Sequence, residues 1–243
     1  MTTLPISSVA AIIPALNEEG SIEGVVAGLI RAGVRTVIVS DNGSTDETAR
    51  VAKAAGATVV AAARRGYGSA CLAGLAALPS DADVVLFCDG DGADDLNYVT
   101  AIVEPILAKR ADLVIGSRVL GTSELGALTL PQRAGNWVAA VMLRLLFSAE
   151  VTDLGPFRAV SRAALAKLEM CDPAFGWTAE MQTKALRLRM RVVEVPVIAR
   201  VRTAGKSKIS GRPIPVLLAG YGILSTILRY RFMPYAGKRD GKP

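Results

Sequence analysis

Short apolar runs alternate with longer segments in which apolar residues recur every three or four positions through the first half of the chain. The short runs have the length and β-branched content of buried parallel strands, and the longer periodicity predicts helices. The expected strands cover residues 9–13, 36–39, 58–60, 84–88 and 113–115, and the expected helices cover residues 21–33, 44–55, 69–78 and 96–110. This order predicts an α/β fold with a Rossmann-like, mostly parallel central sheet and helices on both faces.

The second half of the chain has a less regular pattern. Residues 131–147 have the spacing of an amphipathic helix, and residues 192–201 favour a strand. Pro196 lies within that strand, and because proline cannot donate a ladder hydrogen bond, we expect an edge position or a bulge there. No repeat, low-complexity stretch or linker divides the chain, so we expect one domain over residues 1–243.

A largely apolar segment, residues 214–228, precedes a basic C-terminal stretch. The segment has about 15 residues, fewer than the ~20 that span a bilayer, and it is broken at Gly220, Tyr221 and Gly222. The basic residues that follow are Arg229, Arg231, Lys238, Arg239 and Lys242. This combination fits the surface of a membrane monolayer. It fits equally well a helix docked on the protein's own core or on a second subunit, and the sequence leaves these alternatives open.

The composition narrows the range of partners. Hydrophobic residues make up 51% of the chain and charged residues 21%, as in a globular protein, and the formal net charge is +6. A basic surface favours nucleotides, phosphorylated lipids or acidic membranes. Nucleic acid is a weaker choice, because no basic stretch carries the interleaved aromatic residues that stack on bases.

The absence of histidine excludes several kinds of site. It removes the Ser-His-Asp triad, imidazole acid–base catalysis and most zinc sites, so a metal would need oxygen ligands, which favours Mg²⁺ or Mn²⁺. The three cysteines are far apart and form no CxxC pair, which favours buried thiols in a reducing compartment. We see no signal peptide and expect a cytoplasmic protein, with the inner face of the membrane left open as its place.

The strongest local signal for a metal site is Asp89-Gly90-Asp91, directly after a buried strand. Two carboxylates two positions apart can turn toward one cation, and glycine lets the backbone approach a ligand closely. Asp94 and Asp95 follow and are candidates to cap the next helix. A solvated acidic turn is the alternative explanation. An EF-hand is excluded because Thr100, not a glutamate, stands at the twelfth position.

Polar residues also follow the other expected strands. Ligands of such sheets bind beyond the carboxyl ends of the strands, and the polar clusters that fall there are Asn17-Glu18, Asp41-Asn42, Arg64-Arg65, residues 89–95 and Ser117-Arg118. Asp41 is a candidate to accept hydrogen bonds from a base or ribose, and Ser44 or Thr45 is a candidate helix cap. No GxGxxG or Walker lysine motif is present, and Gly66-Tyr67-Gly68 is too short to count as either.

Six motifs in order resemble glycosyltransferase family 2 with its GT-A fold, and within it the dolichyl-phosphate mannose synthase-like group. The resemblance covers about residues 9–212 and rests on residues 13–19 (IPALNEE), 41–46 (DNGSTD), 89–91 (DGD), 116–118 (GSR), 152–158 (TDLGPFR) and 202–208 (RTAGKSK). Each motif alone is weak, but the ordered set is specific.

The resemblance implies roles for the matched positions. The nucleoside pocket would be formed by Pro14, Leu16, Glu18 and Asp41. The metal motif that grips the diphosphate would be Asp89 and Asp91, and the loop that closes over the phosphates would include Arg202, Ser207 and Lys208. Contacts to an acceptor phosphate would come from Arg118 and Arg133. Electrostatics supports these roles. A metal on Asp89 and Asp91, with Arg202 and Lys208 on the other side, would neutralise the negative charge of a departing diphosphate.

The chain departs from the pattern of this group in three places. The group often has a second aspartate where Asn42 stands and a glutamine or glutamate where Ala93 stands, so contacts to the ribose and to the metal or phosphate are in doubt. Many members also carry transmembrane helices after the catalytic region, and we expect none in this sequence.

Residues 175–182 supply further candidates. Trp177 would stack on a sugar, or it packs in the core. Glu180 is the best candidate for a general base, with a carboxylate at a helix N-terminus as the alternative, and Asp153 is a second candidate that is catalytic or structural. A hydroxyl acceptor needs such a base, whereas a phosphate monoester, with a second pKa of about 6, needs none.

These observations lead to one main hypothesis and two alternatives. The main one is an inverting, metal-dependent hexosyltransferase that uses UDP-glucose or GDP-mannose and a polyprenyl-phosphate acceptor. The first alternative is a soluble enzyme with a small hydroxylated or sugar acceptor and Glu180 as base, and the second is a nucleotide-sugar binding protein without activity. Within the single domain, we expect a nucleotide-sugar half at about residues 1–120, an acceptor half at 121–212 and an amphipathic, basic tail at 213–243. A homo-oligomer is left open.

Overall fold

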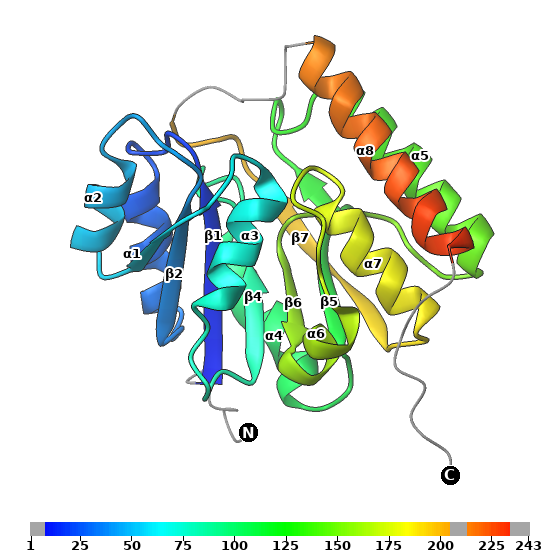
Figure 1. Cartoon of the computed structure of the whole chain (residues 1–243), viewed down its shortest axis with the longest axis horizontal. Helices are drawn as coiled ribbons and strands as arrows, with labels where there is room; N and C mark the ends of the chain where they lie inside the picture. Colours follow the sequence, from blue (N-terminus) through cyan, green and yellow to red (C-terminus); the bar gives the residue numbers. More distant parts are fainter. Residues whose placement is uncertain (1–7, 205–212, 234–243) are drawn as a thin grey trace.

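A twisted seven-stranded sheet runs through the centre of the molecule (Figure 1), and the computed structural model describes residues 8–204 and 213–233 around it. The strands are β1 (Val9–Ala15), β2 (Thr36–Asp41), β3 (Thr58–Ala61), β4 (Val84–Phe87), β5 (Leu113–Ser123), β6 (Arg158–Ser161) and β7 (Val192–Ala199). Their order in the sheet is β3-β2-β1-β4-β6-β5-β7. Only β6 pairs antiparallel with its neighbours, so the prediction of a mostly parallel sheet is confirmed.

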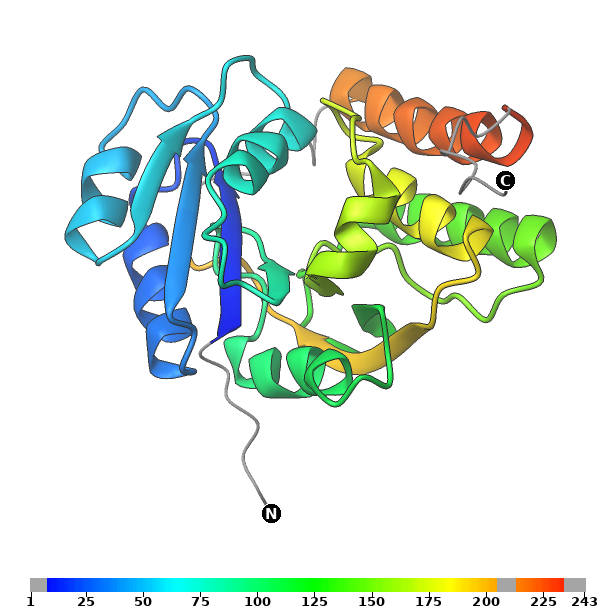
Figure 2. The ribbon, with the colours of Figure 1, turned by 60° about the horizontal axis from the view of Figure 1, so that its bottom comes forward.

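Helices cover both faces of this sheet, as the sequence predicts (Figure 2). They are α1 (Ile22–Arg31), α2 (Thr48–Ala54), α3 (Tyr67–Ala76), α4 (Val99–Leu107), α5 (Leu130–Phe147), α6 (Arg162–Leu168), α7 (Trp177–Arg187) and α8 (Pro213–Phe232). Alternate residues of β1 point to opposite faces: Ala11 and Ile13 pack with α1, α2 and α4, whereas Ile12 packs with α3, α6 and α7. Two apolar layers therefore fix the sheet from both sides.

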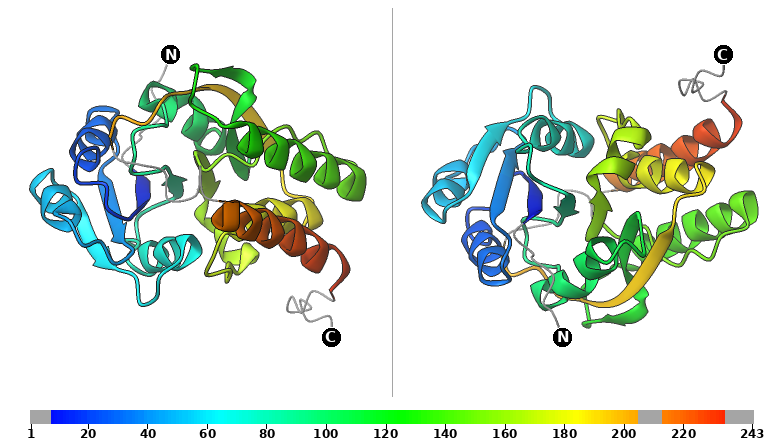
Figure 3. Two further views of the ribbon diagram at one scale, coloured as in Figure 1. Left: turned by 90° about the horizontal axis from the view of Figure 1, so that it is seen from above. Right: turned by 90° about the horizontal axis from the view of Figure 1, so that it is seen from below.

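Helices α5 and α8 lie side by side at one edge of the molecule (Figures 1 and 3). Ala140 and Leu143 of α5 and Ile227 of α8 form a small core with Ala179 of α7. One face of α8 is thus docked on the protein itself, in agreement with one of the alternatives left open above. No helix in the described residues is long and apolar enough to cross a membrane.

Several local expectations hold, and others are wrong. Pro196 lies on β7, which is an edge strand, and the pairing of β5 with β7 shifts register between Ser117 and Thr122. Helix α2 begins at Thr48 rather than at residue 44, because the carboxylate of Asp46 accepts the Thr48 backbone N–H at 3.0 Å. Strand β6 escaped prediction because its four residues include a buried arginine and are too few to show alternation.

Two helical glycines give a matched test of how tightly α3 is packed. A Cβ on Gly74 of α3 would lie 2.5 Å from Ile12 Cγ2 and 2.7 Å from Ser40 Oγ, whereas a Cβ on Gly24 of α1 would meet nothing within 4 Å. We expect Gly74→Ala to lower the free energy of unfolding by about 1–3 kcal/mol through overpacking. Gly24→Ala should raise it by up to about 1 kcal/mol. Urea unfolding measures both, and equal effects of the two changes would contradict this packing.

Candidate active site

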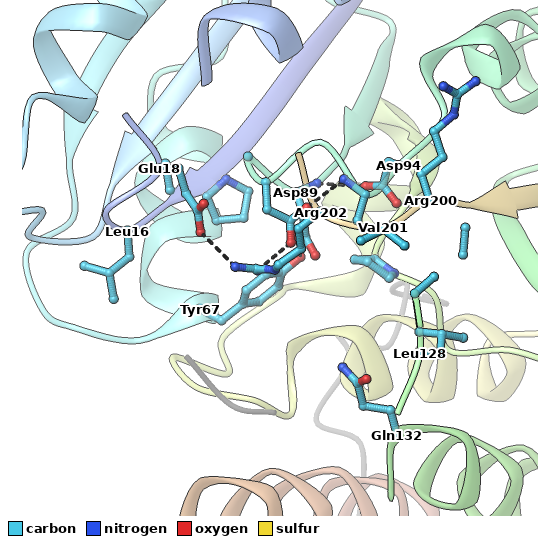
Figure 4. A pocket seen from close by; sticks show the side chains of 18 of the residues that line it. Leu16, Glu18, Tyr67, Asp89, Asp94, Leu128, Gln132, Arg200, Val201 and Arg202 are labelled. Carbon is cyan, nitrogen blue, oxygen red and sulfur yellow. Dashed lines mark hydrogen bonds and ion pairs between the residues drawn. The ribbon is translucent and has the colours of Figure 1, made fainter. Parts of the chain in front are cut away.

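A pocket of about 800 Å³ opens at the carboxyl ends of the strands, where the sequence placed the polar clusters. Its walls come from the ends of β1 and β4, from β5, from the segments before α3 and α5, and from the residues that follow β7. Figure 4 shows Glu18, Tyr67, Asp89 and Arg202 converging there from four separate elements. The topology therefore gathers residues that are far apart in the sequence.

Three carboxylates crowd together in the turn that follows β4. Asp89, Asp91 and Asp94 all line the pocket. The turn is held by Asp91 Oδ1, which accepts the Ala93 N–H at 2.9 Å, and by Asp94 Oδ2, which accepts the Asp89 N–H at 2.9 Å. Gly92 has φ +76°, and a Cβ there would lie 2.5 Å from Thr203 Oγ1, so the turn requires glycine.

The electrostatics of this turn call for positive charge. Burial, and then the charges of Asp91 and Asp94, raise the pKa of Asp89 well above its ordinary value. Burial also raises the pKa of Asp94 to about 7. Tyr67, whose own pKa is raised by burial and by Asp89, donates its hydroxyl to Asp89 Oδ1 at 3.2 Å. Among the described residues, no three His, Cys, Asp or Glu side chains are arranged to hold a metal ion by themselves.

Arg202, just after β7, supplies a counter-charge from the opposite wall. Its Nη2 donates to Asp91 Oδ2, and its Nη1 lies 3.7 Å from Glu18 Oε1. Nη1 is buried and makes no hydrogen bond within the described part of the chain. The guanidinium thus bridges two carboxylates of the pocket wall and keeps an unused donor at Nη1.

The wall formed by the ends of β1 and β2 agrees only in part with the expected nucleoside pocket. Pro14, Leu16 and Glu18 line the cavity. Asp41 does not, because its Oδ1 accepts the Ser44 N–H at 3.1 Å and shapes the turn after β2. Asn42 takes its place in the lining, and its Oδ1 accepts the Gly66 N–H at 2.9 Å.

A rigid arginine marks the other end of the pocket. Arg118, which lines the cavity, donates Nε to Asp153 Oδ2 at 2.8 Å and Nη2 to Asp153 Oδ1 at 2.7 Å. Burial opposes this charge, but the hydrogen bonds and charge of Asp153 outweigh it and raise the pKa of Arg118. Asp153 is fully buried and does not line the pocket, so it acts by positioning Arg118.

Comparison with known proteins identifies the family of this chain. Residues 10–169 match the model of Glycosyl transferase family 2. The chain belongs to this family. It is therefore a glycosyltransferase, and the alternative of a binding protein without activity is set aside.

The relatives of this glycosyltransferase carry names with different acceptors, or with no stated acceptor. It is 40% identical over 206 residues to an uncharacterized glycosyltransferase of Mycobacterium tuberculosis, covering 84% of this chain and 90% of the relative. It is 31% identical to a dolichyl-phosphate hexose transferase of Haloferax volcanii, covering 86% and 90%. A solved structure of glucosyl-3-phosphoglycerate synthase from M. tuberculosis, in complex with Mn²⁺, UDP-glucose and phosphoglyceric acid, superposes with a TM-score of 0.74 at 26% identity, covering 94% of this chain and 81% of that one.

The structure of this glycosyltransferase contradicts the role expected for Glu180. Its carboxylate is fully buried, does not line the pocket, and pairs with Lys184 Nζ at 2.7 Å. It also accepts the Asp172 N–H at 2.8 Å and the Tyr230 hydroxyl at 2.8 Å. Burial opposes ionisation, but these hydrogen bonds prevail and lower the pKa of Glu180. Glu180 anchors the loop before α7, which carries Phe175 into the pocket wall.

Other expected site residues also lie elsewhere. Trp177 is buried against Phe87, with ring centroids 6.0 Å apart, and so cannot stack on a sugar in the pocket. Arg133 is exposed on α5, where its neighbour Gln132 lines the cavity instead. Ser207 and Lys208 lie outside the described residues.

Several lining residues escaped the sequence analysis. These are Tyr67, Leu128, Gln132, Arg200 and Val201. A local pattern could have indicated Tyr67, since it stands between two glycines after a short strand. The sequence analysis compared that triplet only with nucleotide-binding glycine motifs and rejected it. The others face the pocket through tertiary folding, and no local pattern marks them.

The buried pair of Glu180 and Lys184 predicts a change in stability. Glu180→Gln leaves the ammonium group of Lys184, 3% exposed, without its charge partner. We expect the free energy of unfolding to fall by about 3–5 kcal/mol in urea titrations. The double variant Glu180→Gln/Lys184→Met should recover part of this loss. Unchanged stability with lost turnover would instead restore Glu180 as a general base.

Proposed function

We propose that this glycosyltransferase moves a hexose from a nucleoside-diphosphate sugar to the phosphate of a polyprenyl phosphate, with inversion at the anomeric carbon. The observation that carries the proposal is Arg118, a guanidinium held rigidly by buried Asp153 in the same pocket as the aspartate turn. Such a planar, oriented cation fits a phosphate group. The dolichyl-phosphate hexose transferase among its relatives supports this choice of acceptor.

The donor would lie along the wall formed by the ends of β1 and β2, away from Arg118. Pro14, Leu16 and Asn42 are placed for the nucleoside, and UDP-glucose and GDP-mannose are the donors that we propose. Asp89 and Asp91 fit a hard divalent cation, since they are oxygen ligands in a turn that lacks positive charge of its own. Mg²⁺ or Mn²⁺ held there with the donor phosphates would stabilise the departing diphosphate. The related structure with Mn²⁺ and UDP-glucose supports this arrangement.

The chemistry needs no general base when the acceptor is a phosphate. A phosphate monoester has a second pKa of about 6 and is largely ionised at neutral pH. Its oxygen attacks the anomeric carbon as the bond from that carbon to the diphosphate oxygen breaks, and the diphosphate leaves with the electron pair. Arg118 holds the acceptor phosphate, and Arg202 transfers hydrogen bonds to the leaving group. The absence of Glu180 from the pocket is consistent with this route.

Apolar side chains in the same pocket as Arg118 suit the chain attached to the phosphate. Leu128, Phe175 and Val201 line the pocket together with Pro156. Burying isoprenoid carbons against them would gain about 25 cal/mol per Å² of apolar surface. A small polar acceptor would leave these side chains without a partner.

A second candidate is a small acceptor that carries both a hydroxyl and a phosphate. The related synthase, solved with phosphoglyceric acid, favours it. Asp94, with a pKa of about 7 in the pocket, would then take the base role that Glu180 cannot fill. The two candidates share the phosphate contact at Arg118 and differ in whether a proton must be removed.

A transfer assay separates these candidates. Purified protein with Mn²⁺ or Mg²⁺ receives radiolabelled UDP-glucose or GDP-mannose, with polyprenyl phosphate or with 3-phosphoglycerate. We expect label in the organic phase with one donor. Label that moves from the sugar nucleotide to 3-phosphoglycerate, separated by chromatography of the aqueous phase, would establish the second candidate instead.

If the aspartate turn binds a metal, a substitution there should lower both the affinity for Mn²⁺ and the turnover number. We expect Asp91→Asn to weaken Mn²⁺ binding in the presence of UDP, as followed by electron paramagnetic resonance, and to lower kcat about 100-fold or more. Glu23→Gln, which removes an exposed carboxylate on α1, serves as the control and should change neither. Normal Mn²⁺ affinity in Asp91→Asn would refute the metal assignment.

The two candidate acceptor arginines can be separated by the same substitution. Arg118→Lys keeps the charge but loses the planar pairing, so we expect kcat/KM for the acceptor to fall about 10- to 100-fold while donor affinity stays the same. Arg133→Lys, at an exposed position outside the pocket lining, should behave like the original protein. An unchanged kcat/KM in Arg118→Lys would mean that Arg118 does not contact the acceptor, and a loss in Arg133→Lys would restore Arg133 as a contact.

A further inference from the structure

We propose that the outward faces of α5 and α8 form a docking surface for an anionic lipid bilayer. The proposal rests on the proposed function in one respect, since a polyprenyl-phosphate acceptor sits in a membrane. The surface itself is defined by exposed apolar side chains, by arginines and by its position next to the pocket. Each of these observations is independent of the donor sugar.

Both helices are apolar on their outer faces as well as their inner ones. On α5, Leu130, Trp137 and Leu145 are 80%, 63% and 79% exposed, and their spacing of seven and eight residues places them along one stripe. On α8, Leu217, Tyr221, Leu228 and Phe232 form a similar exposed stripe. The small core with α7 accounts for the inner faces only, so the outer stripes need another partner.

The charges beside these stripes have one sign. Neither helix contains an aspartate or a glutamate, although the chain has 22 acidic residues. Arg133 and Arg144 are exposed on α5, and Arg229 and Arg231 are exposed on α8. In the part of the chain that the structure describes, none of these four arginines forms an ion pair. Apolar stripes flanked by unpaired cations match the boundary between lipid headgroups and acyl chains.

A second copy of the same surface is a poorer partner. A twofold interface places the same patch on both subunits, so it would bring the arginines of both copies into one interface. The helices offer no carboxylate to offset that repulsion. Lipid phosphates supply the missing charge, and acyl chains cover the apolar stripes.

The surface is continuous with the pocket that would receive the acceptor. Leu128 and Gln132, at the start of α5, line the cavity. On the α8 side, a Cβ on Gly222 would lie 3.7 Å from Cβ of Phe175, which also lines the cavity. Figure 3 shows both helices projecting together from the side of the sheet. A bilayer on these helices would bring its headgroups to the mouth of the pocket.

Vesicle binding without sugar nucleotide or acceptor tests the surface by itself. The chain has two tryptophans, and because Trp177 is buried, a change in emission on binding reports Trp137. We expect a blue shift and co-sedimentation with vesicles of phosphatidylcholine and phosphatidylglycerol. Binding should be weaker with phosphatidylcholine alone and should fall as salt rises.

Variants on each helix locate the contact. We expect Leu145→Glu and Phe232→Glu each to lower the partition coefficient about 10-fold or more, and Arg144→Gln to lower it about 5-fold on anionic vesicles. The matched control Ile30→Glu changes a 45% exposed apolar residue on α1 and should have no effect. Circular dichroism verifies that each variant is folded.

Two results would overturn the proposal. One is the absence of binding to any vesicle, or binding that the helix variants leave unchanged. The other is a dimer in analytical ultracentrifugation that Leu145→Glu dissociates, without vesicle binding, which would make the surface a contact between copies. Vesicle binding without transfer to polyprenyl phosphate would leave the surface in place and refute the proposed acceptor, so the two failures are distinguishable.

Discussion

Uncompensated negative charge in the turn after β4 is the constraint on which the rest of the site depends. Asp89, Asp91 and Asp94 lie close together and are largely removed from water. Asp91 and Asp94 raise the free energy of ionising Asp89, and Asp91 also raises that of Asp94. Arg118, on β5, and Arg202, just after β7, approach from the opposite side and offset part of that charge. The sheet order β4-β6-β5-β7 places these groups within reach of one another.

The wall of the pocket that carries Arg118 also pairs a buried carboxylate with a guanidinium. Arg118 is held by Asp153, and Asp153 also accepts the Arg118 backbone N–H at 2.8 Å. The guanidinium is therefore oriented before any ligand arrives, which reduces the entropy lost on binding. Glu180 and Lys184 form a second buried ion pair behind the pocket. This pair holds the loop before α7 in place and does not face the pocket.

Strand and helix periodicity was sufficient to predict the fold, because the strands of a doubly covered sheet are short continuous apolar runs. The aspartate turn was also predictable, since its residues are adjacent in the sequence. The roles of Glu180 and Trp177 were not, because a polar or aromatic residue at a helix start looks the same whether it faces a cavity or the core. Asp41 was misplaced by one position, since only the geometry of the turn decides that Asn42 faces the pocket.

The contact between Arg202 and Asp91 has a thermodynamic consequence. An oxygen of Asp91 that accepts a hydrogen bond from Arg202 cannot offer the same lone pair to a cation without cost. An anion that draws the guanidinium toward itself removes that cost, and a cation on Asp91 in turn releases the guanidinium for the anion. Linkage requires the two effects to be equal, so cation and diphosphate should bind this pocket cooperatively. The protein would then show little affinity for either alone and respond mainly to their combined presence.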